Sequence, residues 1–465
     1  MKAMHHKVKR VHFIGIGGSG MCGIAEVLLN LGYRVHGSDL QKSPVTERLE
    51  GLGARIAYGH AAENLSDVQV VVRSTAIRDD NPEIQAARER AIPVIPRAEM
   101  LAELMRLKYG VAVGGTHGKT TTTSMIATML GGTDLDPTVV IGGRLNSINS
   151  NARLGQGEIL VAEADESDGS FLALSPIIAV ITNIDREHLD YYRGGLAEIE
   201  ENFVAFANKV PFYGLVVLCL DDPRVQEIMP RIKRRISTYG FNPQADIRAV
   251  EVVSEGMRSR FTVLAEGREL GEFVIDMPGR HYVLNCLAAI ATGFELGLEF
   301  TEIRRNLSGF AGVQRRLQVL GEYRGALVID DYGHHPTEIV ATLEALRQAW
   351  PERRLLAVFQ PHRYTRTHHL FNDFLVAFNE ADILAVTEIY AAGEAPISGV
   401  SGQVLADAIR QHGHKQVSFC PDFDSLQEFV AGQLEPDDLL LTLGAGNICQ
   451  FSRGLAEKRQ NKGGG

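Results

Sequence analysis

The chain has 465 residues, of which 45% are hydrophobic and 22% are charged, as in ordinary globular proteins. This length predicts about two to four domains, because one domain usually holds ~100–200 residues. The formal net charge of −10 argues against a nucleic-acid-binding protein, which needs a basic surface to neutralise phosphates. The cysteines are scattered, odd in number and never form a CxxC pair, so we expect reduced thiols.

No stretch of the sequence approaches the roughly 20 apolar residues that a membrane-spanning helix needs. Residues 2–10 are basic and residues 11–25 are fairly apolar, as in a signal peptide. However, the apolar segment is rich in glycine and no A-x-A cleavage site follows it. We therefore expect a cytoplasmic protein without membrane insertion.

The first hundred residues alternate short apolar strands with helical segments. The expected strands are 11–14, 33–37, 68–73 and 92–95, and the expected helices are 19–31 and 81–90. This alternation predicts a doubly wound, Rossmann-like sheet over residues 1–108.

Two further α/β series follow. Strands are expected at 158–162, 177–182 and 215–220, and then at 326–329, 355–359, 383–387 and 439–443; a long helix is expected at 279–296. The sequence thus predicts three consecutive α/β domains: a Rossmann-like domain at 1–108, a P-loop ATPase-like domain at 109–316 and a Rossmann-like domain at 317–465.

A glycine-rich loop connects the first expected strand with the first expected helix. Gly15, Gly17 and Gly20 match the pattern G-x-G-x-x-G, and Asp39 follows about 20 residues later. Such glycines let a diphosphate approach the N-terminus of a helix. The motif indicates a nucleotide diphosphate site; NAD is the obvious ligand, but the motif does not specify the nucleotide.

A second glycine loop, G-T-H-G-K-T-T-T at 115–122, follows an apolar strand at 111–113 and precedes a helical run at 124–130. Strand, glycine loop, Lys-Thr and helix form the arrangement of a phosphate-binding loop, in which backbone N–H groups and the lysine hold phosphates and the threonine binds magnesium. Val113 stands where the full Walker motif has its first glycine. The remaining pattern still predicts an ATP phosphate site.

Carboxylates follow two strands of the same predicted sheet. The segment E-A-D-E-S-D spans 163–168, and N-I-D-R-E-H-L-D spans 183–190. A run of acids is usually a solvated loop, but carboxylates beside a phosphate loop suit Mg²⁺, which prefers oxygen ligands. His188 becomes a candidate ligand or charge-stabilising group at this site.

Two clusters in the last third also follow strands: D-D-Y-G-H-H-P at 330–336 and Q-P-H-R-Y-T-R at 360–366. Adjacent histidines point in different directions, which argues against zinc. Arg363 and Arg366, three residues apart at the end of a strand, could bind a carboxylate in bidentate fashion. The alternative is a pair of surface arginines near a helix start.

Six motifs in order give the sequence a close resemblance to the Mur ligases: GTHGKTTT, EADESD, TNIxxxHLD, PGRHxxLN, DDYGHHPTE and PHRYTR. The resemblance covers essentially the whole chain and is strongest to members that attach L-alanine to UDP-N-acetylmuramate. It implies an ATP-dependent amide ligase of peptidoglycan precursor synthesis, which forms an acyl phosphate and releases ADP and phosphate.

The resemblance also implies roles for individual residues. It places UDP-N-acetylmuramate at Gly15, Gly17, Gly18, Ser19, Asp39 and Ser74. It places ATP at Gly115, Thr116, His117, Gly118, Lys119, Thr120, Thr121, His281, Asn285, Arg316 and Asp331. Two Mg²⁺ ions are implied, with Thr120, Glu163 and His188 as ligands. L-Alanine is assigned to Tyr332, His334, His362, Arg363 and Arg366.

Lys119, His188 and His334 are the implied catalytic residues. His334 is a candidate acceptor of the ammonium proton, with carboxylate or phosphate oxygens of the substrates as competitors. The chain departs from the family pattern at Tyr282, where the usual residue is asparagine, and this puts one adenine contact in doubt.

Other functions remain open at this point. A related ligase could add a different amino acid or a peptide to the same sugar nucleotide. The first hundred residues alone would suit an NAD-dependent oxidoreductase, and the phosphate loop alone a non-catalytic nucleotide-binding module. A monomer and a homodimer are both compatible with the sequence.

Overall fold

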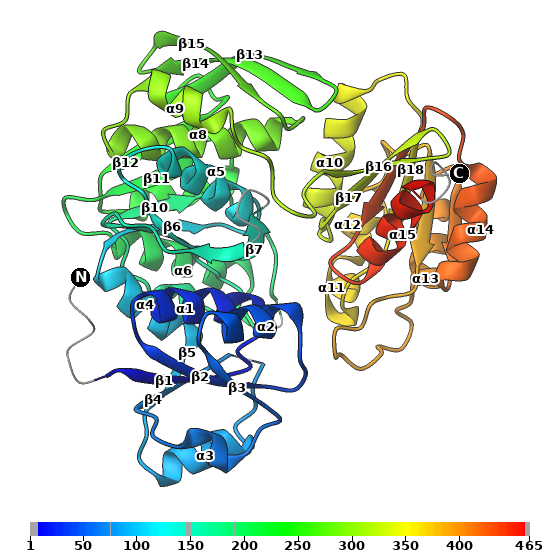
Figure 1. Cartoon of the computed structure of the whole chain (residues 1–465). Helices are drawn as coiled ribbons and strands as arrows, with labels where there is room; N and C mark the ends of the chain where they lie inside the picture. The colour runs from blue at the N-terminus through cyan, green and yellow to red at the C-terminus, as the bar shows by residue number, and fades with distance from the viewer. Residues whose placement is uncertain (1–7, 75, 146–149, 190, 461–465) are drawn as a thin grey trace.

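The computed structural model describes residues 8–74, 76–145, 150–189 and 191–460. This part of the chain forms three α/β units, whose sheets contain five, ten and six strands (Figure 1). The first unit (blue) lies against the second (cyan to green), and the third (yellow to red) lies beside the second. The predicted fold class, three consecutive α/β domains, is confirmed.

The N-terminal sheet is parallel throughout and has the strand order β3-β2-β1-β4-β5. Its strands are β1 (Arg10–Ile14), β2 (Arg34–Asp39), β3 (Arg55–Tyr58), β4 (Val70–Arg73) and β5 (Val94–Pro96). The helices are α1 (Ser19–Asn30), α2 (Pro44–Gly51), α3 (Pro82–Glu89) and α4 (Arg97–Arg106). The chain leaves β1 toward β2 on one side and later returns to β4 on the other. The glycine-rich loop after β1 therefore lies at the switch point of the sheet, where such folds bind ligands.

The middle sheet places β6 (Tyr109–Gly114) between β9 (Ile159–Glu163) and β10 (Ile178–Ile181), all parallel. The sheet continues with β11 (Leu215–Cys219) and β12 (Ile236–Gly240) on one side, and with β7 (Thr138–Leu145) and β8 (Ser150–Arg153) on the other. An antiparallel extension follows β12: β13 (Ile247–Glu255), β14 (Arg258–Ala265) and β15 (Arg268–Ile275).

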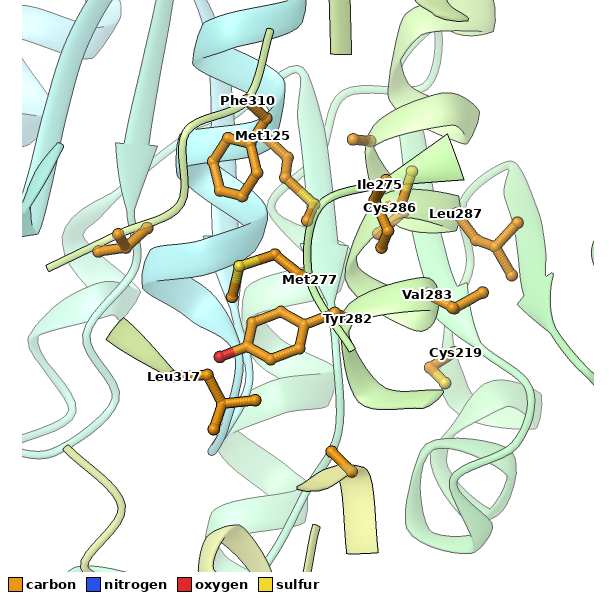
Figure 2. Close-up of a cluster of buried hydrophobic side chains, with 14 of the residues drawn as sticks. Met125, Cys219, Ile275, Met277, Tyr282, Val283, Cys286, Leu287, Phe310 and Leu317 are labelled. Atoms are coloured by element: carbon orange, nitrogen blue, oxygen red, sulfur yellow. The ribbon is translucent and has the colours of Figure 1, made fainter. Parts of the chain in front are cut away.

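The helices of this unit are α5 (Lys119–Gly131), α6 (Leu196–Asn208), α7 (Pro223–Ile228), α8 (Arg280–Glu295) and α9 (Phe300–Leu307). The contact between α5 and α8 forms much of the core, where Met125 faces Cys286 with Met277 and Phe310 nearby (Figure 2). This buried packing fixes the helix that follows the phosphate loop, because close-packed interiors resist displacement.

The C-terminal sheet has the strand order β16-β17-β21-β18-β19-β20. Its strands are β16 (Gln318–Tyr323), β17 (Ala326–Asp331), β18 (Leu355–Phe359), β19 (Ile383–Thr387), β20 (Val417–Cys420) and β21 (Leu439–Leu443). The helices are α10 (Pro336–Ala349), α11 (Tyr364–His369), α12 (Phe371–Phe374), α13 (Gly402–Gln411), α14 (Phe423–Gln433) and α15 (Ile448–Gln460). The edge strand β16 is antiparallel, and the other strands are parallel.

The units touch at two places that matter for function. Helix α1 packs against β7 and β8, and helix α10 packs against β13 and α8 (Figure 1). New sheets begin at Tyr109 and Gln318, so we propose domain junctions at 108/109 and 316/317. Within the described ranges, no helix has the length and apolar character needed to cross a membrane.

Candidate active site

The phosphate loop has a backbone that only glycine accommodates. Gly115 has φ = 128° and Gly118 has φ = 82°, and a Cβ on Gly115 would lie 2.0 Å from Thr182 Oγ1. The hydroxyl of Thr182 donates to the carbonyl of His117 at 2.6 Å, and the amide of His117 donates to Asn183 Oδ1 at 2.7 Å. The end of β10 therefore holds the loop in shape.

Lys119 lies folded over this loop. Its Nζ donates to the carbonyls of Gly115 (2.7 Å) and Thr116 (3.0 Å) and lies 2.8 Å from a carboxylate oxygen of Glu166. Glu166 is only 3% exposed, and its burial raises its pKa to about 7. Burial opposes the charge of Lys119, but the neighbouring carboxylates outweigh it and raise the lysine pKa. The ammonium group is thus charged and lies at the phosphate loop.

Two of the predicted metal ligands, Thr120 and Glu163, meet at the start of α5. Thr120 Oγ1 donates to Glu163 Oε1 at 2.5 Å, and Glu163 ends β9. His188 has φ = 54°, and burial lowers its pKa, so its ring is neutral near pH 7. The charges of Lys119 and Asp165 act on this pKa, so His188 lies toward the same edge of the sheet. A hydroxyl oxygen and a carboxylate suit Mg²⁺, which prefers oxygen ligands. A neutral imidazole such as that of His188 can also coordinate a metal ion.

His117 connects the phosphate loop to the C-terminal unit. Its Nε2 lies 3.1 Å from Asp185 Oδ2, and its Nδ1 lies 3.3 Å from Glu338 Oε1 on α10. Burial alone would lower the pKa of His117, but hydrogen bonds to the two carboxylates raise it to about 9. The family resemblance implied an ATP contact for His117 and no role for Glu338, although Glu338 belongs to the motif DDYGHHPTE.

His117, Asp185 and His335 bring three possible metal-ligand atoms within 4.8 Å of one another. However, His335 Nδ1 accepts a hydrogen bond from the Thr337 amide (3.3 Å), and its Nε2 donates to the Arg186 carbonyl (3.2 Å). Both ring nitrogens of His335 are therefore engaged. The cluster is a hydrogen-bonded junction between two units, and its nitrogens are poorly placed for a metal ion.

A cavity of about 510 Å³ opens on one side of the phosphate loop. The predicted ATP residues that line it are His117, Gly118, Thr121, His281, Asn285, Arg316 and Asp331. Burial lowers the pKa of His281 to about 4 and raises that of Asp331 to about 6. Asp331 accepts the amides of Leu317 and Gly333, both at 2.7 Å. The cavity draws on both the middle and the C-terminal unit, and it suits a nucleotide in size.

Tyr282 also lines this cavity and is 3% exposed. Its ring packs on His281 with the centroids 4.2 Å apart, and its hydroxyl points toward Leu317 (Figure 2). The tyrosine therefore fills space at the cavity wall with an aromatic surface, whereas an asparagine would offer an amide.

A second cavity, of about 280 Å³, opens on the other side of the loop. Lys119 and Glu163 line it from the middle unit, and Gly20 and Arg97 line it from the N-terminal unit. The start of α5 thus separates a nucleotide-sized cavity from one that reaches the first turn of α1. Nothing in the sequence motifs pointed to Arg97.

The first glycine-rich loop is held by Asp39. The amide of Gly17 donates to Asp39 Oδ2 at 2.8 Å, and a Cβ on Gly17 would lie 2.9 Å from that oxygen. Gly15 has φ = 76°, and the amide of Gly18 donates to its carbonyl at 3.1 Å. The aspartate at the end of β2 therefore shapes the loop directly.

The other two predicted residues of this site lie close by. Ser74 follows β4, and its carbonyl accepts the amide of Ile77, whose Cδ1 would lie 3.5 Å from a Cβ on Gly15. Ser19 begins α1, but its side chain lies outside the described residues.

The five residues predicted to bind alanine also gather in one place. The ring of His334 lies 5.4 Å from that of Tyr332 and 5.9 Å from that of His362. Arg366 Nη1 contacts the His362 carbonyl at 3.1 Å, and Arg363 belongs to the same turn.

Both arginines are paired with carboxylates of the chain itself. Arg366 Nη2 lies 2.9 Å from Glu187 Oε1, and both side chains are buried. Arg363 Nε lies 2.8 Å from Glu394 Oε1. Access to a substrate carboxylate would require either arginine to exchange this partner. The role of the pair in alanine binding stays a prediction.

His334 has a weakly basic ring in this structure. Burial lowers its pKa to about 3, and Arg366 adds to this effect, although Glu338 opposes it. A general base works best with a pKa near the working pH. This arrangement therefore favours the substrate oxygens as the proton acceptor over His334.

Comparison with known proteins gives the same family along the whole chain. Residues 10–109 match the family described as "Mur ligase family, catalytic domain". Residues 113–293 match "Mur ligase middle domain", and residues 315–446 match "Mur ligase, glutamate ligase domain".

Individual relatives are similar over nearly their full length. The chain is 58% identical to the UDP-N-acetylmuramate--L-alanine ligase of Trichlorobacter lovleyi over 455 residues, covering 98% of this chain and 100% of the relative. It is 57% identical to the enzyme of that name from Geobacter sulfurreducens, with coverage of 98% and 100%. The crystal structure of the UDP-N-acetylmuramate-alanine ligase from Thermotoga maritima has a TM-score of 0.82 at 30% identity and covers 97% of this chain and 99% of that one. The chain belongs to the Mur ligase family.

Proposed function

We propose that the chain joins L-alanine to the lactyl carboxylate of UDP-N-acetylmuramate, with conversion of ATP to ADP and phosphate. The observation that supports this most directly is the position of the phosphate loop between two cavities. One suits a nucleotide, and the other connects Lys119 to the unit that carries the first glycine-rich loop. The full-length similarity to ligases of this name supports the same reaction.

A carboxylate must be activated before it can form an amide, because it is a poor electrophile. We propose that a lactyl carboxylate oxygen attacks the γ-phosphorus of ATP, while the bond to the β,γ-bridging oxygen breaks and ADP departs with that electron pair. Lys119 and the loop amides stabilise the charge on the transferred group. Thr120, Glu163 and His188 would hold Mg²⁺, which when bound neutralises phosphate charge.

The amine of alanine then attacks the acyl phosphate carbon. The tetrahedral intermediate collapses with loss of phosphate, and the ammonium proton passes to a base. Phosphate oxygens are the favoured acceptor, since burial leaves His334 weakly basic. The C-terminal unit contributes to the ATP cavity and carries the Arg363–Arg366 turn, so its approach would bring the amine donor to the acyl phosphate and exclude water. All three sites lie on one chain, so we expect a monomer to be competent.

Phosphate release by the purified protein tests the proposal. We expect release only when ATP, UDP-N-acetylmuramate and L-alanine are all present, with a product heavier by one alanyl residue. Initial rates with glycine, L-serine and a tripeptide in place of alanine would identify a related ligase. Release that does not require both acceptor substrates would rule the proposal out.

A further inference from the structure

Arg97 opens helix α4, and its side chain crosses the first turn of α1. A Cβ placed on Gly20 would lie 3.0 Å from Arg97 Cδ and 3.1 Å from its Nε and Nη1. Real Cβ atoms rarely approach other atoms so closely, so Gly20 makes room for the guanidinium group. The lack of a side chain at Gly20, the third glycine of the G-x-G-x-x-G motif, thus leaves space for the side chain of Arg97.

The guanidinium group lines the cavity that Lys119 and Glu163 line from the other side. Arg97 is 21% exposed, and its Nη2 lies 3.5 Å from Oδ2 of Asp165, whose side chain is 45% exposed. This pair is long and partly exposed, so it contributes little to stability and a better-placed anion can replace Asp165. Among the described residues that line the cavity, Arg97 and Lys119 are the cations.

The two cations have different surroundings. Lys119 belongs to the ATP phosphate loop and contacts the loop carbonyls. Arg97 comes from the unit that would carry the sugar nucleotide. Gly15, Gly17 and Gly18, whose amides suit a diphosphate, do not line this cavity. An anion seated beside Arg97 is therefore a different group of the acceptor, and it faces the site of phosphoryl transfer.

The geometry points to Arg97 as the residue that binds the lactyl carboxylate of the acceptor and orients it toward the phosphate loop. This assignment rests on the proposed function. A guanidinium group donates two parallel hydrogen bonds and so fixes the plane of a carboxylate, which a lysine cannot do. Arg97 is thereby a substrate-binding residue that positions the nucleophile.

Calorimetric titration of Arg97→Met with two ligands tests this role. UDP-N-acetylmuramate carries the carboxylate, and UDP-N-acetylglucosamine has the same diphosphate but lacks the lactyl group. We expect Arg97→Met to bind the first ligand roughly 10- to 100-fold more weakly, as the loss of a charge-assisted pair implies, and the second ligand as wild type does. Arg106→Met is the matched control on the same helix, 59% exposed and distant from the cavity, and should bind both ligands normally.

Arg97→Lys provides a second variant, because lysine keeps the positive charge but cannot donate two parallel hydrogen bonds to a carboxylate. It should show the same selective loss, with normal ATP binding and an unchanged melting temperature as evidence of folding. Equal weakening for both ligands would assign Arg97 to the diphosphate and overturn the inference, as would normal binding of both. If the wild-type protein releases phosphate with the three substrates but neither variant loses affinity for UDP-N-acetylmuramate alone, only the role of Arg97 is refuted. If wild type releases no phosphate with the three substrates, the proposed function itself fails.

Discussion

Lys119 is held at the phosphate loop by contacts with two loop carbonyls and with Glu166, and a phosphate would have to replace one of these three partners. Preorganised charge of this kind stabilises a transition state more than a mobile side chain does. The glycine-rich loop of the N-terminal unit is a separate structure, held by Asp39. A mutation in the phosphate loop should therefore leave binding of the sugar nucleotide at the N-terminal unit unchanged.

We expect Lys119→Ala to lower kcat by at least about 10²–10³-fold, since one preorganised charge stabilising the transferred phosphoryl group is lost. The dissociation constant for UDP-N-acetylmuramate should stay within about twofold of wild type. Steady-state kinetics and calorimetry measure the two effects. Lys233→Ala, at an exposed position, is the control and should leave both unchanged. Parallel loss of turnover and sugar-nucleotide binding would contradict separate sites.

His117 should make stability depend on pH. Its folded-state pKa of about 9 exceeds the value of about 6.5 expected in the unfolded chain. The protonated ring therefore stabilises the fold fully below about pH 6.5, and this contribution, at most about 3 kcal/mol, is lost as the pH rises through about 9. Urea unfolding between pH 6.5 and 9.5 measures it. We expect the free energy of unfolding of the wild-type protein to fall over this pH range and that of His117→Asn to change less. The same dependence of unfolding free energy on pH in both proteins would show that Asp185 and Glu338 do not stabilise the protonated ring of His117.

At the scale of elements, the segment that follows β10 joins the middle and C-terminal units. Asp185 accepts the hydroxyl of Thr337 at 2.6 Å, and Glu187 pairs with Arg366 on α11. These contacts connect the loop that carries His188 to α10 and α11. Movement of the C-terminal unit would therefore also displace the loop that carries His188, at the edge of the phosphate site.

Glu187→Gln should loosen this connection. Breaking a buried ion pair leaves an uncompensated charge and costs about 3–5 kcal/mol, whereas an exposed pair contributes about 0–1 kcal/mol. We expect amide hydrogen exchange in α11 to accelerate roughly 100-fold or more. Asp373→Asn removes the exposed Arg186–Asp373 pair at the same interface and should change exchange less than about fivefold. Equal acceleration in both variants would show that burial of Glu187 contributes nothing.

Most central strands and their order along the chain could be predicted from the sequence, because a strand buried on both faces is a continuous apolar run. Examples are 355–359 and 439–443, which match β18 and β21. The antiparallel strands β13 to β15 were not predicted, since they alternate buried and exposed residues and carry many charges. Helix α5 was expected from residue 124 but begins at Lys119. Threonines are poor helix formers, and here the geometry of the phosphate loop sets the start.

The candidate site could be predicted only where a motif is local. The two glycine loops and the acids after β9 and β10 follow directly from their neighbours in sequence. Arg97 and Glu338 could not be found this way, because each reaches its site through packing between units. The pairing of Arg363 and Arg366 with carboxylates was also unforeseen, since Glu187 comes from the middle unit and Glu394 from a later loop of the C-terminal unit.

At the scale of the whole molecule, each of the two cavities is lined by residues of two different units. The cavity of about 510 Å³ is lined by residues of the middle and C-terminal units, and the cavity of about 280 Å³ by residues of the N-terminal and middle units. The phosphate loop lies in the central unit between β6 and α5 (Figure 1). Residues of this loop and of the start of α5 line both cavities. This arrangement supports transfer of a phosphoryl group from one cavity to an acceptor in the other, followed by amide formation.

The fate of the lactyl carboxylate oxygens tests this transfer most directly. UDP-N-acetylmuramate labelled with oxygen-18 in both carboxylate oxygens is incubated with the protein, ATP and L-alanine, and the phosphate and the product are analysed by mass spectrometry. An acyl phosphate predicts one labelled oxygen in the released phosphate and one in the new amide. Unlabelled phosphate, formed alongside product or without it, would contradict phosphorylation of the acceptor at the Lys119 loop.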